Sequence, residues 1–108
     1  MHVVTEKHLK EAAEQYPGAA AQIAAWRAIA RDGHWRSFID LQQVFADADC
    51  VGDYVVFKIH RNRYRLVTII HYSRRPEGET AEGHIWIRSF LTDKQYENAG
   101  NWDKGVVR

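Results

Sequence analysis

The chain has little cysteine and no long apolar run, and each shortage excludes a class of protein. Cys50 is the one cysteine among 108 residues, which excludes an internal disulfide framework and favours a reducing compartment. No apolar stretch is long enough to cross a bilayer, and the first ten residues, MHVVTEKHLK, lack the pattern of a signal peptide. We therefore expect a soluble protein of the cytoplasm that has no membrane partner.

Metal-ligand spacing is missing as well. The chain has six histidines, yet none belongs to an H-x-x-x-H or Cys/His ligand pattern. We therefore expect no metal site and no cofactor.

The residues that are present suffice for one compact domain. A chain of 108 residues is close to the commonest domain size, and it can bury roughly two thirds of its unfolded surface. Its hydrophobic content of 45% and charged content of 27% are ordinary for a globular protein. No repeat, low-complexity tract or linker divides the sequence. We predict a single domain over residues 1–108.

The positive charge is concentrated in one part of the chain. Residues 1–53 have a balance of −3 and residues 77–108 a balance of −2, whereas residues 54–76 hold six Lys or Arg and no acid. A local concentration of charge attracts an anionic partner more than a net charge of +1 suggests. A solvated basic hairpin is the alternative at this point.

Apolar residues recur at helical spacing in the first half of the chain. The spacing predicts a helix over residues 6–16, with Thr5 as its N-cap, and a second helix over 18–33. The two helices form a hairpin. A shorter third helix is predicted over residues 37–48, and the sequence CVGD after it is typical of a turn.

From residue 54 the apolar period changes to two. The segments YVVFKI, RYRLVTIIHY and HIWIRSFL have strand composition, and Asn62 suits a tight hairpin turn because asparagine tolerates positive φ. A short helix capped by Thr92 follows, and the tail after residue 100 is weakly patterned. The predicted fold class is α+β, with an N-terminal helical hairpin packed on a small antiparallel β-sheet.

Alternation along the three strands separates an apolar face from a basic one. If the apolar sets pack against the helices, the opposite face displays basic side chains between aromatic rings: Lys58, Arg63, Arg65 and Arg88 among Tyr54, Trp86 and Phe90. Guanidinium groups bind phosphate and aromatic rings stack on bases, so this face suits single-stranded nucleic acid. An exposed sheet face with mixed side chains is the alternative.

Three segments in order resemble the HigB family of type II toxins: MHVVTEKHLKEAAEQYP, YVVFKIHRNRYRLVTIIHY and IWIRSFLTDKQYENAGNW. The resemblance covers most of the chain and is strongest over residues 54–72 and 85–98. It implies the RelE/ParE-like toxin fold and an mRNA interferase, often acting on the translating ribosome. It also implies a heteromeric complex with a helix-turn-helix antitoxin, HigA.

The sequence departs from the family pattern at two places. Family members usually have Thr-His-X-X-Tyr after the last strand, whereas this chain has Asp93 in place of the histidine. The loop over residues 73–84 is also longer than the hairpin typical of the family. His71 lies in the same strand phase as the arginines and is a hypothetical substitute for the missing histidine.

RNA cleavage without metal needs a base for the 2′-hydroxyl, a cation for the phosphate and an acid for the leaving oxygen. We predict that Arg65 and Arg88 clamp the phosphate, and that Lys58, Lys94 and Tyr96 supply charge or transfer protons. The residues predicted to position RNA are Asn62, Arg63, His71 and Trp86.

Each of these roles has a structural alternative. An ion pair would explain either clamp arginine, packing of the last helix would explain Tyr96, and a turn would explain Asn62. Asp93 could hold an arginine, act as a base or cap the last helix. At the level of function, the alternatives are a toxin of the same fold that inhibits a protein such as DNA gyrase, and an RNA-binding module without chemistry.

Overall fold

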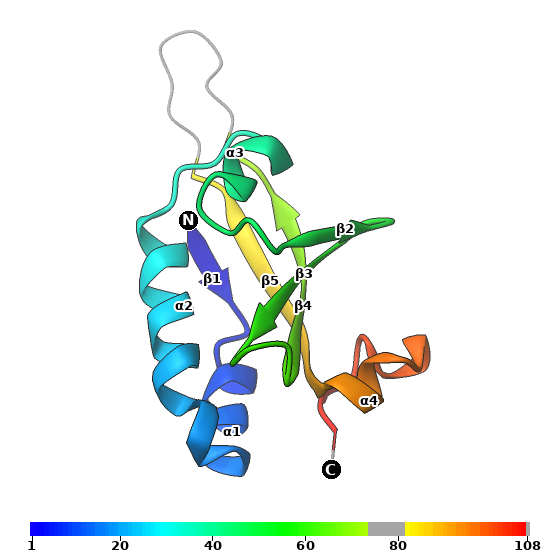
Figure 1. Ribbon diagram of the computed structural model, residues 1–108. Helices are drawn as coiled ribbons and strands as arrows, with labels where there is room; N and C mark the ends of the chain where they lie inside the picture. Colours follow the sequence, from blue (N-terminus) through cyan, green and yellow to red (C-terminus); the bar gives the residue numbers. More distant parts are fainter. Residues whose placement is uncertain (74–81, 108) are drawn as a thin grey trace, which may run out of the picture.

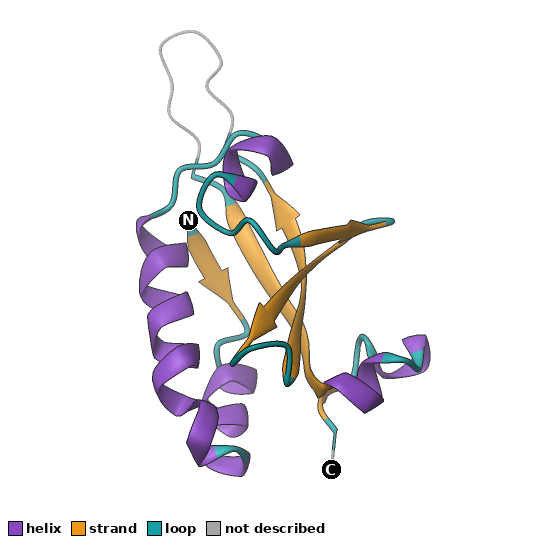
Figure 2. Cartoon of the chain, viewed as in Figure 1, coloured by secondary structure: helices purple, strands orange, loops and turns teal. Residues whose placement is uncertain are grey.

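The computed structural model describes residues 1–73 and 82–107, and its architecture is α+β, as predicted (Figures 1 and 2). In chain order the elements are β1 (His2–Val4), α1 (Lys7–Gln15), the 3₁₀ turn η1 (Pro17–Ala19), α2 (Ala20–Asp32), α3 (Phe38–Gln42), β2 (Asp49–Val51), β3 (Tyr54–Ile59), β4 (Tyr64–His71), β5 (His84–Thr92), α4 (Asp93–Tyr96), the 3₁₀ turn η2 (Ala99–Asn101) and β6 (Gly105–Val106).

The described residues form a six-stranded sheet with an antiparallel centre. Its strand order is β1-β5-β4-β3-β2, and β6 also pairs with β5. The three predicted strands are the antiparallel core β3, β4 and β5, whereas β1 and β6 run parallel to β5. The sheet is therefore wider than expected, because strands from both ends of the chain join the same partner.

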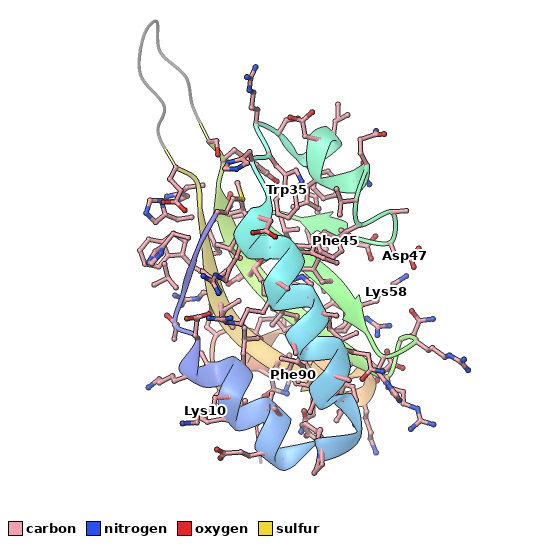
Figure 3. The ribbon with its side chains drawn as sticks, turned by 90° about the vertical axis from the view of Figure 1, so that its left-hand side faces the viewer. Lys10, Trp35, Phe45, Asp47, Lys58 and Phe90 are labelled. Carbon is pink, nitrogen blue, oxygen red and sulfur yellow. The ribbon has the colours of Figure 1, made fainter. Side chains whose placement is uncertain are left out.

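Helices α1 and α2 lie on one face of the sheet (Figures 1 and 3). The apolar stripes of the helices and the inward side chains of β3, β4 and β5 share one buried cluster. At its centre Phe57 meets Trp26 and Phe45 edge to face, with ring centroids 5.2 and 5.0 Å apart. This contact fixes α2 and the segment after α3 against β3, and the opposite face carries Lys58 and Arg65.

A bulge in β5 changes which side chains face the helices. The pairing of β4 with β5 shifts between Val67 and Thr68, which leaves Arg88 without an opposite partner. After the bulge the alternation is reversed, so Phe90 is fully buried among the helix-side residues and Leu91 lies on the other face. The expectation that Phe90 is displayed on the basic face is wrong, because simple alternation does not anticipate an extra residue.

The C-terminal segment covers part of the face opposite the helices. A second apolar cluster buries Val56, Val67 and Leu91 there, under Tyr54, Tyr96, Trp102 and Val107. The tail that looked weakly patterned thus contains η2, β6 and an anchoring tryptophan. The basic face is therefore not a bare sheet surface.

Three local expectations are also corrected. The third helix ends at Gln42, and Val44 is exposed rather than buried. The sequence CVGD, read as a turn, turns only at residues 52–53, because Cys50 and Val51 belong to the edge strand β2 (Asp49–Val51). Thr5 does not cap α1, because Glu6 occupies that position and Thr5 has a φ of 67°. The predicted caps Ser37 and Thr92 do accept backbone N–H groups. Most of the long loop over 73–84 lies outside the described residues.

No helix within residues 1–73 and 82–107 is both long and apolar enough to cross a membrane.

Two buried hydroxyl groups in the sheet predict opposite effects of mutation on stability. Thr68 donates a 2.8 Å hydrogen bond to the carbonyl of Val55, whereas the hydroxyl of Ser89 is buried without a protein partner. We expect Thr68→Val to lower the free energy of unfolding by about 1 kcal/mol, and Ser89→Ala to leave it unchanged or raise it. Urea unfolding of both variants measures the difference, and equal losses would contradict the assignment.

Candidate functional site

The site is built where the β3–β4 hairpin meets α4. Lys58 pairs with Arg65, and Arg65 pairs with Leu91, so these three residues form a row across β3, β4 and β5. The row lies on the face opposite the helices, as predicted for Lys58 and Arg65. Lys58 is exposed, and the side chain of Arg65 is 12% exposed.

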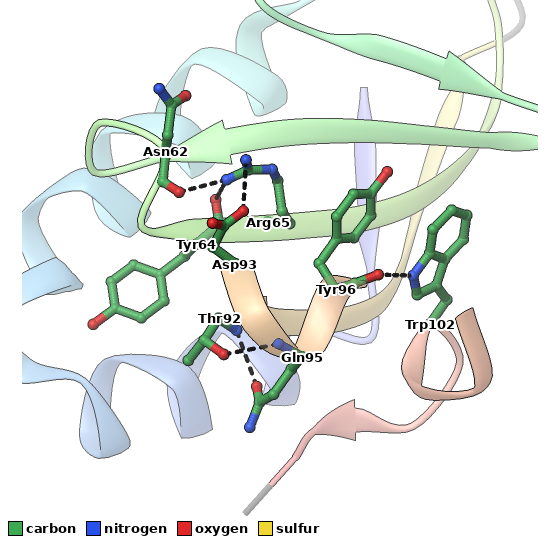
Figure 4. Close-up of polar contacts among 8 residues, drawn as sticks. All are labelled: Asn62, Tyr64, Arg65, Thr92, Asp93, Gln95, Tyr96 and Trp102. Atoms are coloured by element: carbon green, nitrogen blue, oxygen red, sulfur yellow. Dashed lines mark hydrogen bonds and ion pairs between the residues drawn. The ribbon is translucent and has the colours of Figure 1, made fainter. Parts of the chain in front are cut away.

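Arg65 is held by contacts to three residues, Asn62 in the hairpin turn and Asp93 and Tyr96 in α4 (Figure 4). One Nη of its guanidinium lies 2.9 Å from Oδ1 of Asp93, and the other donates a 2.6 Å hydrogen bond to the carbonyl of Asn62. The guanidinium carbon also lies 5.7 Å from the centre of the Tyr96 ring. The ion pair that was one alternative for Arg65 therefore exists, and its role as a phosphate clamp stays a prediction.

A capping box fixes the carboxylate that Arg65 meets. Thr92 accepts a 3.1 Å hydrogen bond from the N–H of Gln95, and the Gln95 side chain accepts one of 2.9 Å from the N–H of Thr92. The N–H of Asp93 donates to the carbonyl of Arg63, at 2.9 Å, so the first turn of α4 is tied to the hairpin. Asp93 is the first residue of α4, and its side chain is 64% exposed.

Tyr96 is fixed by Trp102. Their rings are stacked with an interplanar angle of 1° and a centroid distance of 4.9 Å, and the Trp102 Nε1–H donates to the carbonyl of Tyr96 at 2.9 Å. Burial raises the pKa of the Tyr96 hydroxyl, Asp49 raises it further and Arg65 opposes the change. The hydroxyl is therefore protonated at neutral pH, and it can donate a proton but cannot accept one as a base.

Arg88 belongs to a second ion pair. Its Nε lies 2.7 Å from Oδ1 of Asp103, and the Tyr54 hydroxyl donates a 2.7 Å hydrogen bond to Oδ2 of the same carboxylate. Both hydrogen bonds lower the pKa of the Asp103 carboxyl, and the one from Tyr54 has the larger effect. The Tyr54 ring meets Trp102 edge to face at 5.3 Å, so aromatic rings connect this pair to the Arg65 group. The two predicted clamp arginines therefore lie on one face but in two separate ion pairs.

The remaining predicted residues fall into two places. Arg63 and Asn62 are exposed in the hairpin turn, and Lys94 is exposed on α4 beside Asp93. His71 and Trp86 lie at the other end of the sheet, with ring centroids 6.1 Å apart. His71 follows Arg65 by six positions in β4, which is roughly 20 Å along a strand. His71 is therefore too far from Arg65 to replace the missing histidine there.

Sequence reasoning missed Asp103 and Trp102, which hold Arg88 and Tyr96. Both belong to the segment after α4, which has no periodic apolar pattern. Their roles depend on contacts between residues distant in sequence, and the presence of a tryptophan in a polar tail was the one available signal.

The spacing of histidine and cysteine in the sequence predicted no metal site. In the part of the chain that the structure describes, no group of three or more His, Cys, Asp or Glu side chains lies close enough together to hold a metal ion.

The lowered pKa of Asp103 predicts how this ion pair responds to pH. A carboxylate with a depressed folded pKa contributes stability above its unfolded pKa, and the contribution is lost as pH falls through the folded pKa. We expect Asp103→Asn to lower the free energy of unfolding by less than about 1 kcal/mol at pH 7, because the pair is solvent-exposed. In urea unfolding the difference from wild type should shrink as pH falls below the ordinary range of a carboxyl, and a difference that is constant with pH would contradict this assignment.

Comparison with known proteins places this geometry in a family. The chain matches, over residues 19–99, the family model of the HigB toxin, described as the RelE-like toxic component of a toxin–antitoxin system. It is 27% identical over 100 residues to the mRNA interferase toxin HigB of Escherichia coli K12, which covers 90% of this chain and 88% of that protein.

The same identity and coverage hold for the proteins named mRNA interferase HigB in Escherichia coli O157:H7 and Shigella flexneri. The family model covers most of the chain and includes α2, the antiparallel centre of the sheet and α4. The resemblance predicted from the sequence is therefore confirmed, and the chain belongs to the HigB family of RelE-like toxins from toxin–antitoxin systems.

Proposed function

We propose that this chain is an endoribonuclease that cleaves mRNA. The observation that carries the proposal is the fixed guanidinium of Arg65, which meets the exposed carboxylate of Asp93 beside the ring of Tyr96. The relatives named as mRNA interferases support it. A cation, a carboxylate and a neutral hydroxyl within one group are what metal-independent RNA cleavage requires.

Arg65 binds the scissile phosphate. Its side chain is pre-oriented by the Asn62 carbonyl, so little side-chain entropy is lost when a phosphate oxygen takes the place of Asp93. Lys58 is its direct neighbour across the β3–β4 pair and adds a second positive charge. Lys94, exposed next to Asp93, contributes to the same positive field.

Asp93 and Tyr96 transfer the protons. Asp93 takes the proton of the 2′-hydroxyl, and the 2′-oxygen then attacks phosphorus. The bond from phosphorus to the 5′-oxygen breaks, and Tyr96 gives its proton to that oxygen. The products are a 2′,3′-cyclic phosphate and a 5′-hydroxyl end. In this role Asp93 replaces the histidine of the family pattern, and the raised pKa of Tyr96 keeps the acid protonated.

Arg88, Arg63 and Trp86 contact the RNA strand away from the scissile bond. Arg88 is 41% exposed at its side chain and, like Arg65, exchanges a carboxylate for phosphate. Trp86 is exposed and stacks with His84 at 6.1 Å, an arrangement suited to a further base.

Translation and an antitoxin regulate the cleavage. We propose that the substrate is mRNA on the ribosome and that the partner is a HigA-type helix-turn-helix antitoxin. The family description as the toxic component of a toxin–antitoxin system supports an antitoxin partner.

Mapping of RNA 5′ ends after brief induced expression tests the proposed site. Wild type should produce new 5′-hydroxyl ends inside coding regions, and Arg65→Ala should reduce them on the order of 10²–10³-fold, the usual loss when a charge-stabilising group is removed. Arg88→Ala should reduce them less, because this arginine lies farther from the proton-transfer groups. Arg36→Ala, which removes an exposed arginine elsewhere, is the matched control and should behave as wild type.

Two further samples decide the substrate and the reaction class. A transcript without its start codon should lose the cuts if the ribosome presents the substrate. Cleavage by the purified protein with translating ribosomes should still yield 5′-hydroxyl ends. Growth arrest with intact mRNA would contradict the nuclease proposal and favour inhibition of a protein such as gyrase. Cuts that survive Arg65→Ala would show that the active site lies elsewhere.

A further inference from the structure

A basic pocket opens at the tip of the β3–β4 hairpin, outside the residues assigned to chemistry. It has a volume of about 360 Å³ and is lined by Gln22 of α2 together with His60, Arg61 and Arg63 of the turn. None of these lining residues is acidic, and two of them are arginines. Three of the four residues, Gln22, His60 and Arg61, were not predicted from the sequence.

The backbone of this turn has an unusual conformation. His60, Arg61 and Asn62 have φ values of 54°, 55° and 72°, three successive non-glycine residues in the left-handed region. Asparagine tolerates this region, but each of the other two costs on the order of 1–3 kcal/mol there. Glycine adopts the same φ without the steric cost. A turn selected for stability alone would therefore have glycine where this chain has Arg61.

The turn is held by the same residues that build the active site. The N–H of Arg63 donates to the carbonyl of His60 at 3.2 Å, and the carbonyl of Arg63 accepts from the N–H of Asp93 at 2.9 Å. Arg65 donates to the carbonyl of Asn62 at 2.6 Å. The pocket is thereby fixed relative to Arg65 and Asp93.

We propose that this pocket is a second phosphate subsite, which binds a backbone phosphate of the RNA strand beyond the one held by Arg65. The proposal rests on the function proposed above. Arg61 and Arg63 bind the phosphate oxygens, and the amide of Gln22 donates a further hydrogen bond. The strained turn holds Arg61 and Arg63 at the lining of one pocket, which gives the strain a function.

Binding of a non-cleavable RNA with 2′-O-methyl nucleotides, measured by fluorescence anisotropy over a salt series, tests the subsite. Each phosphate contact in a single strand contributes about 0.7 to the slope of log K against log salt. Arg61→Gly should weaken binding roughly tenfold at low salt and lower the slope by about 0.7, while thermal stability stays equal or rises. Lys10→Ala removes an exposed positive charge on α1 and is the control.

A second variant leaves the turn untouched. Gln22→Glu places a negative charge in the pocket and should also weaken binding and lower the slope. Gln43→Glu, at an exposed position after α3, is its matched control.

The outcomes separate the subsite from the proposed function. If wild type binds and cleaves RNA but Arg61→Gly and Gln22→Glu match their controls, the subsite is refuted and the nuclease stands. If wild type neither binds the RNA nor cleaves mRNA on translating ribosomes, both proposals fail. Weaker binding by both pocket variants, with stability retained, supports the subsite.

Discussion

The guanidinium of Arg65 is the interaction on which the site depends. It joins the hairpin turn to α4, because it binds the carbonyl of Asn62 in the turn, pairs with Asp93 at the start of α4 and lies over the Tyr96 ring of the same helix. At 12% exposure a guanidinium is stable only when its donors are paired. The hairpin turn and α4 are therefore positioned by the same charged group.

The two partners of this group differ in how easily they are replaced. The carbonyl of Asn62 belongs to the backbone and stays in place, whereas the carboxylate of Asp93 is 64% exposed and stands at the end of a short side chain. Because the Asp93 carboxylate is itself well solvated, a phosphate oxygen can take its place at Arg65 while the buried guanidinium stays paired. Arg88 and Asp103 repeat this arrangement on the other side of Trp102. We interpret the two aspartates as occupying the places that phosphates take when RNA is bound.

The regular elements and the positive hairpin could be predicted from the sequence because they depend on local patterns. Periodicity located α1, α2 and the three central strands, and the capping role of Thr92 followed from its position before a short helix. Placing Lys58 and Arg65 on one face required only the alternation of a strand. The sequence resemblance then identified the family.

The rest of the site depends on contacts that no local pattern reveals. The bulge at Arg88 reverses the alternation of β5, so Phe90 was assigned to the wrong face. Two further contacts depend on the C-terminal segment: β6 pairs with β5, and Trp102 stacks on Tyr96. This segment has no periodic pattern of apolar residues, so neither contact could be predicted. The hairpin turn and the positive φ of Asn62 were predicted, but the left-handed conformation of Arg61 was missed, since arginine is not a residue that predicts positive φ.

The central claim is that phosphate replaces Asp93 at Arg65 and that Asp93 then acts as the base. Asp93→Asn tests both parts, with affinity measured on non-cleavable RNA and cleavage measured on natural mRNA with translating ribosomes. Because the variant removes the charge that competes with phosphate but also removes the base, the account predicts tighter binding together with much slower cleavage. Unchanged or weaker binding together with a wild-type cleavage rate would contradict it.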